Sequence, residues 1–180
     1  MLPLFVKGQE FWDEEHEQFV YGNDVTLKLE HSLISISKWE SKWMVPFFES
    51  EKTSDMVKDY IKCMTLNTNV DPSVYDRLTL KNIDEINEYI ASPMTASTIK
   101  ETKKGPVKTS EIITSELIYY WMTAFNIPAE YEKWHLNRLI MLVRICSEKS
   151  KPPKKMSARE IMAQNKALNA ARKKALGTKG

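Results

Sequence analysis

The stretch that decides the fold is EYEKWHLNRLIMLVRICSEKSKPPKK, residues 130–155. Its first part predicts a helix. At 100° per residue, the polar side chains of that helix gather in one narrow sector, and apolar side chains cover most of the rest. A surface helix of a globular protein needs an apolar arc of little more than about 100°. The sequence therefore predicts either the central helix of a domain or a helix with one face reserved for a partner, with candidate contacts at Trp134, Leu139 and Leu142.

Behind this helix the chain becomes a basic arm. Residues 149–180 hold ten Lys or Arg and one acidic residue, a net charge of +9, whereas residues 1–148 hold 16 basic and 23 acidic residues, a net charge of −7. Pro152-Pro153 is a stiff break between the helix and the arm. Ser157–Glu160 has the capping-box pattern for a last helix that Gly177 can end. This charge asymmetry indicates an interaction arm for nucleic acid, for an acidic protein or for the chain's own acidic body.

The predicted last helix carries a narrow apolar row. Ile161, Leu168 and Ala175 recur every seven residues, which is typical of a helix that docks on another helix. The arm contains no aromatic residue for base stacking. Docking on a partner or on the protein itself is therefore favoured over a solvated arm, and nucleic acid is the least favoured partner. The candidate contacts in the arm are Lys154, Lys155, Ile161, Leu168, Arg172, Lys173 and Lys174.

The predicted fold class is mainly α: a helical domain with a small N-terminal β-hairpin and a C-terminal basic helix or arm. We expect a β-rich segment at 1–31 packed on the body, a helical body at 32–148 with a loop at 91–110, and the basic arm at 149–180. Apolar and polar residues alternate next to Gly22–Asp24, which predicts a hairpin turn there. The loop at 91–110 is interpreted as a mobile loop or a short extended pair.

Helical spacing begins after Ser32. One apolar stripe, on a helix that ends near Pro46, is formed by Ile36, Trp39, Trp43 and Phe47. Thr53 is a suitable N-cap for the next helix. Ser110 is expected to cap a long helix that ends at Pro128. The short connection from there to the helix at 130 predicts an antiparallel helical hairpin.

Motifs for catalysis or metal binding are absent from the sequence. There is no GxxxxGK[ST], GxGxxG or GxSxG, no HExxH and no Cys/His cluster with ligand spacing. His135 is interpreted as a buried imidazole bonded to a backbone carbonyl or a tyrosine hydroxyl, with metal binding or catalysis as the alternative. Cys63 and Cys146 are interpreted as unpaired in a reducing cytosol. We expect no enzyme, no catalytic or metal-binding residues and no cofactor. With no signal peptide and no long apolar run, we also expect no membrane association.

Several stretches of the chain, from about residue 30 onward, form a pattern of packing motifs. They are SISKWESKWMVPF (35–47), DYIKCMT (59–65), VDPSVYDRL (70–78), EINEYIASPMTAST (85–98), ITSELIYYWMTAFNIPAEYEKWHLNRLIMLVRIC (113–146) and PPKKMSAREIMAQNKALNAARKK (152–174). This pattern resembles small proteins encoded among the tail genes of long-tailed bacteriophages, of the tail assembly chaperone type.

The resemblance implies a non-catalytic protein of virion morphogenesis in the host cytoplasm. Such a protein would bind the tape-measure and tail-tube proteins of the phage through protein–protein contacts, with self-association as a further possibility. Two alternatives stay open at this point. One is a structural virion component, such as a connector or tail subunit, and the other is a nucleic-acid-binding accessory protein that uses the basic arm.

Overall fold

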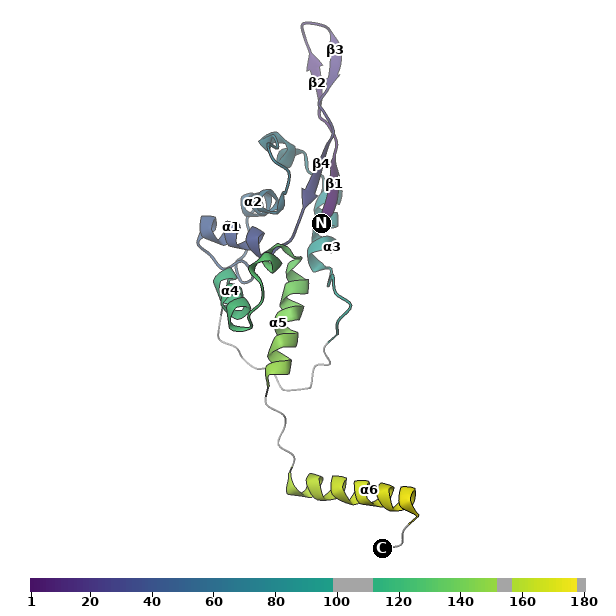
Figure 1. Ribbon diagram of the computed structural model, residues 1–180. Helices are drawn as coiled ribbons and strands as arrows, with labels where there is room; N and C mark the ends of the chain where they lie inside the picture. Colours follow the sequence, from purple (N-terminus) through teal and green to yellow (C-terminus); the bar gives the residue numbers. More distant parts are fainter. Residues whose placement is uncertain (99–111, 152–156, 178–180) are drawn as a thin grey trace. The chain divides into compact units, whose positions relative to one another are not determined.

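A computed structural model describes residues 1–98, 112–151 and 157–177 (Figure 1). The fold is mainly helical with a small antiparallel sheet at the N-terminus, which confirms the predicted fold class. The chain forms two compact units, Met1–Glu148 and Lys149–Gly180.

The first unit begins with a two-stranded antiparallel ribbon. β1 (Leu2–Val6) pairs with β4 (Val25–Leu29), and β2 (Glu10–Asp13) pairs with β3 (Gln18–Tyr21). The predicted hairpin turn at Gly22–Asp24 is therefore wrong, because the strands on its two sides do not pair with each other. The ribbon instead turns between β2 and β3.

Two glycines explain how the chain passes from one pair of strands to the other. The Gly22 N–H donates to the carbonyl of Gln9 over 2.8 Å, and the Gly8 N–H donates to Oδ1 of Asp24 over 2.7 Å. A Cβ atom on Gly8 would lie 1.8 Å from the carbonyl oxygen of Gly22. Gly22–Asp24 has the composition of a turn, but it lies at a close junction between the β2–β3 pair and the β1–β4 pair.

The edges of the β1–β4 pair are covered by other parts of the unit. α3 (Leu80–Ala91) packs along β1, where the Asn82 side chain donates to the carbonyl of Phe5 over 3.1 Å. Along β4, the Leu66 N–H donates to the carbonyl of Lys28 over 2.8 Å. The amide of Asn67 extends this pairing, because it accepts from the Lys28 N–H and donates to the carbonyl of Thr26.

Three helical segments come between β4 and α3, and each has a local N-cap. They are α1 (Leu33–Trp43), capped by Ser32, α2 (Ser54–Met64), capped by Thr53 as predicted, and the 3-10 helix η1 (Pro72–Arg77), capped by Asp71. A serine, threonine or aspartate oxygen at this position accepts an N–H that the first helical turn leaves unpaired. Local chemistry therefore sets where these helices begin.

The core of this unit lies between the ribbon and the helices. Ile36 and Trp39 of the predicted stripe are fully buried, Phe47 is buried just beyond α1, and Trp43 is partly buried. The other fully buried large side chains come from β1, β4, α1, α2 and the helical residues between 115 and 150; they include Leu4, Leu27, Leu29, Leu33, Ile61, Met64, Ile118, Leu136 and Leu139.

Glu40 joins α1 to two other segments. Its buried carboxylate accepts the Phe47 N–H over 2.8 Å and the Ser115 N–H over 2.7 Å. Ser115 is the first residue of α4 (Ser115–Ala124), so the carboxylate lies at the positive end of that helix. Thr114 is the N-cap of α4, and the predicted cap Ser110 lies outside the described residues.

The predicted helical hairpin does not form. α4 packs against α1, and it is followed by the 3-10 helix η2 (Ala129–Lys133) and by α5 (Leu136–Ser150), so the segment that was expected to be one helix from Glu130 is broken (Figure 1). The break at Trp134–His135 has a tertiary cause. The Leu136 N–H donates to the carbonyl of His31 over 2.7 Å, and Ser32 and His135 form an isolated antiparallel bridge.

Candidate partner-binding surfaces

Among the described residues of the second unit, the last turn of α5 is followed by one further helix. α6 (Ala158–Leu176) is capped by Ser157, which forms a capping box with Glu160, and it ends at Gly177 in the left-handed conformation. Both features confirm the sequence prediction. Every described residue of the helix is exposed, including Ile161 at 45% and Leu168 at 48%. α6 therefore offers its whole surface to solvent or to a partner.

The side chains of α6 form two opposed rows. Ile161, Leu168 and Ala175 lie within about 40° of one another on a helical wheel, at 100° per residue. A basic row lies about 160° away from this apolar row on the same wheel, and it consists of Arg159, Lys166 and Lys173. Of the other basic residues predicted as contacts, Arg172 borders the apolar row and Lys174 lies between the two rows. Lys154 and Lys155 lie outside the described residues.

The predicted partner contacts in and just before α5 are less exposed than those on α6. Leu139 is fully buried in the core, so its assignment as a partner contact is wrong. Trp134 is half-buried, with its ring stacked on Tyr131 at a centroid distance of 4.0 Å, and the Arg138 guanidinium lies 4.0 Å from the Trp134 ring centroid. Leu142 is half-buried. These three side chains are therefore less exposed than Ile161 and Leu168 on α6.

A buried polar cluster occupies the point where β4, α1, α2, α3 and α5 meet. His135 is 5% exposed, and its Nε2 lies 3.0 Å from the carbonyl oxygen of Tyr89, which confirms the interpretation as a buried imidazole bonded to a carbonyl. His31 is 2% exposed, and its Nδ1 lies 2.5 Å from the hydroxyl of Tyr60. The two imidazole rings are in edge contact, with their centroids 5.2 Å apart. Sequence reasoning missed this pairing, because the two histidines are far apart along the chain.

Burial keeps both imidazoles neutral. Burial, together with a smaller contribution from the neighbouring His135, lowers the pKa of His31 to about 3. Burial also lowers the pKa of His135, although the hydrogen bond to the Tyr89 carbonyl opposes this shift. Tyr89 in turn donates to Glu30 over 2.7 Å, and both burial and this hydrogen bond raise the pKa of the tyrosine. The groups are bonded to one another inside the unit, so the cluster ties five elements together.

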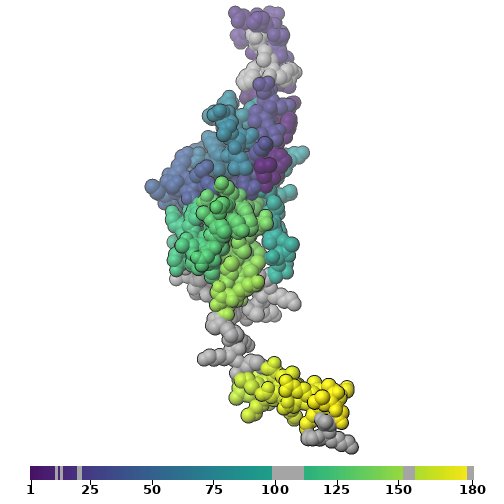
Figure 2. Space-filling model, in the orientation of Figure 1, coloured from purple at the N-terminus to yellow at the C-terminus, as the bar shows by residue number. Residues whose placement is uncertain are grey.

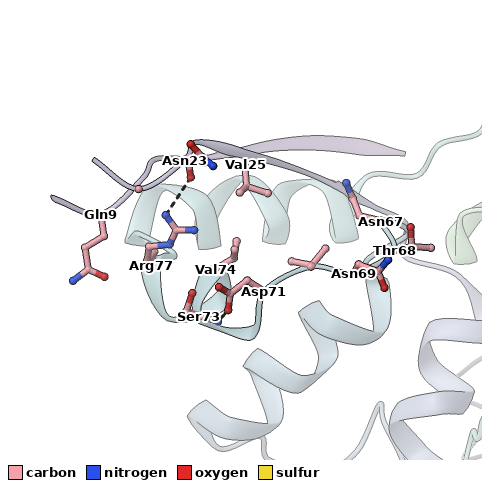
Figure 3. A pocket seen from close by; sticks show the side chains of 12 residues that line it. Gln9, Asn23, Val25, Asn67, Thr68, Asn69, Asp71, Ser73, Val74 and Arg77 are labelled. Carbon is pink, nitrogen blue, oxygen red and sulfur yellow. Dashed lines mark hydrogen bonds between the residues drawn. The ribbon is translucent and has the colours of Figure 1, made fainter. Parts of the chain in front are cut away.

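A cavity of about 500 Å³ lies where the ribbon junction faces η1 and the loop before it (Figure 3). Arg77 reaches across it and donates to the carbonyls of Lys7 over 3.2 Å and Asn23 over 3.5 Å. The rest of the lining consists mainly of amide and hydroxyl groups, with Asp71 as the acidic residue. Hydrogen bonds from the backbone and the side chain of Ser73 lower the pKa of Asp71, and the Arg77 guanidinium makes a smaller contribution in the same direction. This lining can hold a small polar group.

Within 1–98, 112–151 and 157–177, no three His, Cys, Asp or Glu side chains are grouped so that they could hold a metal ion. Cys63 and Cys146 are free, as predicted, and both are half-buried. None of the helices in these ranges is long and apolar enough to span a membrane.

A second exposed surface lies on the ribbon. Trp12 on β2 is directly opposite Phe19 on β3, and their rings meet edge to face at a centroid distance of 4.9 Å. The two rings are 52% and 59% exposed. The sequence analysis did not select them; an available signal was that the two aromatic residues flank the acidic run at 13–17.

Comparison of the chain with protein-family models, with curated proteins and with solved structures finds no match in any of the three.

Proposed function

We propose that the chain is a non-catalytic tail assembly chaperone of a long-tailed bacteriophage, which binds the tape-measure and tail-tube proteins in the host cytoplasm. The proposal combines the resemblance of residues 30–174 to such proteins with one structural observation. That observation is the exposed, fully capped α6, whose apolar row has no covering element among the residues that the structure describes.

The apolar row suits a helical partner. A row that recurs every seven residues packs into the groove of a second helix, and tape-measure proteins, as implied by the resemblance, are long and helical. Burying the exposed halves of Ile161 and Leu168 would contribute about 1 kcal/mol each, at roughly 25 cal/mol per Å². Charged side chains around the row would add steering and specificity more than affinity. The result is moderate, reversible binding, which is what a chaperone needs.

The basic charge of α6 also raises the possibility of nucleic-acid binding, but two features disfavour it. The segment 149–180 contains no aromatic residue on which a base could stack. A helix that only neutralises phosphates has no need of an apolar row. Binding to DNA that falls steeply with salt and disappears on deletion of 149–180 would support the nucleic-acid alternative instead.

The proposal is tested by co-expression with the tape-measure protein of the same phage. We expect this chain to keep the tape-measure protein soluble, and we expect Leu168→Asp to abolish the effect by placing a charge in the apolar row. Ala170→Asp is the matched control, because it adds the same charge to the same helix about 160° away from Leu168 on the wheel. Equal precipitation of the tape-measure protein with and without this chain would refute the proposal.

The same experiment can be extended to the finished particle. A chaperone is expected in lysates of infected cells and absent from purified virions. Its presence at a fixed stoichiometry in purified virions would favour the alternative of a connector or tail subunit.

A further inference from the structure

The two strand pairs of the ribbon differ in how they are covered by the rest of the unit: β1–β4 is the inner pair and β2–β3 is the outer pair. α3 and residues 64–67 cover the edges of β1 and β4, as described above. β2 and β3 instead make their contacts chiefly with each other, and the described atoms at the tip of the ribbon have no helix beside them in the view of Figure 2. A two-stranded ribbon alone is only marginally stable in water. The exposed Trp12 and Phe19 are therefore placed where a partner would stabilise the ribbon.

The ribbon also carries a concentrated negative charge. Residues 10–18 contain five acidic residues and no lysine or arginine. Glu10, Glu14 and Glu17 are exposed, on strand β2 and in the turn that follows it. Two ribbons brought tip to tip would repel each other, because ten carboxylates would be gathered in one place. A partner for this surface should carry positive charge and a narrow apolar face.

α6 has both properties. Its residues 158–176 contain five Lys or Arg and one Glu, a net charge of +4. The apolar row of α6 is bordered by Arg172, whose guanidinium can lie over an aromatic ring while pairing with a carboxylate. Trp and Phe side chains bury roughly 150–250 Å² each when fully covered. Because the rings of Trp12 and Phe19 are each a little more than half exposed, docking would cover roughly 100 Å² on each.

Chain connectivity favours the α6 of a second copy over the chain's own. α5 starts beside the inner end of β4 and runs away from the ribbon for about 22 Å, at 1.5 Å per residue (Figure 1). Residues 19–31 add about 40 Å along the ribbon, at roughly 3.3 Å per residue. The seven residue steps from Ser150 to Ser157 span at most about 25 Å, and Ile161 lies about 6 Å further along α6. The chain's own α6 therefore cannot place Ile161 on Trp12.

We infer that the Trp12–Phe19 face of one copy binds the apolar row of α6 from a second copy, so that the protein self-associates head to tail. The contact is heterologous, because it joins the ribbon of one copy to the α6 of another, and each copy carries both surfaces. Self-association occupies the α6 row that the proposed chaperone function uses. It does not depend on that function, because it requires no tail protein.

The test measures molar mass by analytical ultracentrifugation of the full chain at tens of micromolar. We expect oligomers in low salt and a shift toward monomer in 0.5 M NaCl, because salt screens the attraction between exposed charges. A ribbon variant, Trp12→Ser with Phe19→Ser, should be monomeric alone, and so should Leu168→Asp. Ala170→Asp should associate like the wild type.

Mixing the two monomeric variants gives the sharpest result. The mixture contains one intact ribbon and one intact α6 row, so it should form dimers and no larger species. A monomeric wild type, a mixture that stays monomeric, or self-association of either variant alone would each overturn the inference. Self-association of the ribbon variant would indicate pairing between two α6 helices.

A second ribbon variant tests the inference without altering the aromatic pair. Glu10→Lys with Glu14→Lys reverses two charges, and it should also lower the mass to that of the monomer in low salt. Circular dichroism and thermal melting of each variant check that unit 1 is folded. A charge-reversed ribbon that associates as well as the wild type would contradict the role given to charge. Leu168→Asp should lose both self-association and tape-measure binding, whereas the ribbon variants should lose only self-association.

Discussion

Lowering the pH from 7 to 5 is expected to destabilise the first unit through His31. This side chain is 2% exposed, and burial holds its pKa at about 3, below the ordinary value of 6.5 that it regains in the unfolded chain. Below pH 6.5 the unfolded state therefore binds a proton that the folded state excludes. The stabilisation is complete above pH 6.5, and it is lost progressively as the pH falls toward 3.

The size of the effect follows from the shift in pKa. Each pH unit between the two pKa values changes the free energy of unfolding by about 1.4 kcal/mol. From pH 6.5 to pH 5, His31 alone is thus expected to remove about 2 kcal/mol. His135 acts in the same direction, because burial lowers its pKa as well. A loss of this size is a large share of the roughly 5–15 kcal/mol that stabilises a typical domain.

The assay is urea unfolding followed by tryptophan fluorescence at pH 7, 6 and 5. His31→Asn retains a polar group near the Tyr60 hydroxyl and does not titrate. Its stability should be lower at every pH, because the smaller side chain leaves a cavity. It should also vary by about 2 kcal/mol less than the wild type between pH 6.5 and 5.

His16→Asn is the matched control, because His16 is exposed in the turn between β2 and β3. This variant should retain the pH dependence of the wild type. Equal stability of the wild type at pH 7 and pH 5 would refute the reasoning, and so would an unchanged pH dependence in His31→Asn.

Three further predictions concern packing. Glu40→Gln should lower the free energy of unfolding by about 1–3 kcal/mol, because the carboxylate accepts backbone N–H groups with two oxygens and a glutamine has only one. The control Glu51→Gln changes an exposed residue and should leave the midpoint of urea unfolding unchanged. Gly8→Ala should lower the melting temperature and disrupt the junction, because the added Cβ would lie 1.8 Å from the Gly22 oxygen, and strand amide exchange measured by NMR would detect the loss. Deletion of 149–180 should leave cooperative melting of the first unit intact by calorimetry, and a broadened transition would show that α6 belongs to its core.

Local chemistry made much of the chain predictable. The N-cap at Thr53, the capping box at Ser157–Glu160 and the helix end at Gly177 depend on contacts within a few residues, and all three were predicted. The mainly helical fold class follows from apolar spacing, which is also a local property. The charge division between the two ends of the chain requires no structure at all, because it is a property of composition.

The surfaces for binding were only half predictable. The exposed row on α6 was visible as a seven-residue repeat, and the structure leaves it exposed. Leu139 belongs to the same kind of apolar pattern, but it is fully buried. An apolar repeat identifies residues that are stabilised by burial. It does not show whether another part of the same chain or a partner protein covers them.

Contacts between distant segments decided the rest. The sequence by itself determined where most helices begin, which residues are apolar and where charge accumulates. The tertiary structure decided that β4 pairs with β1 rather than β3, that the His31 carbonyl breaks the expected helix before Leu136, and that Trp12 and Phe19 stay exposed. The reason is that a backbone N–H can donate to any acceptor within hydrogen-bond distance, and an apolar ring can be covered by any apolar surface beside it. Which group lies in reach is set only when segments far apart in the chain pack together.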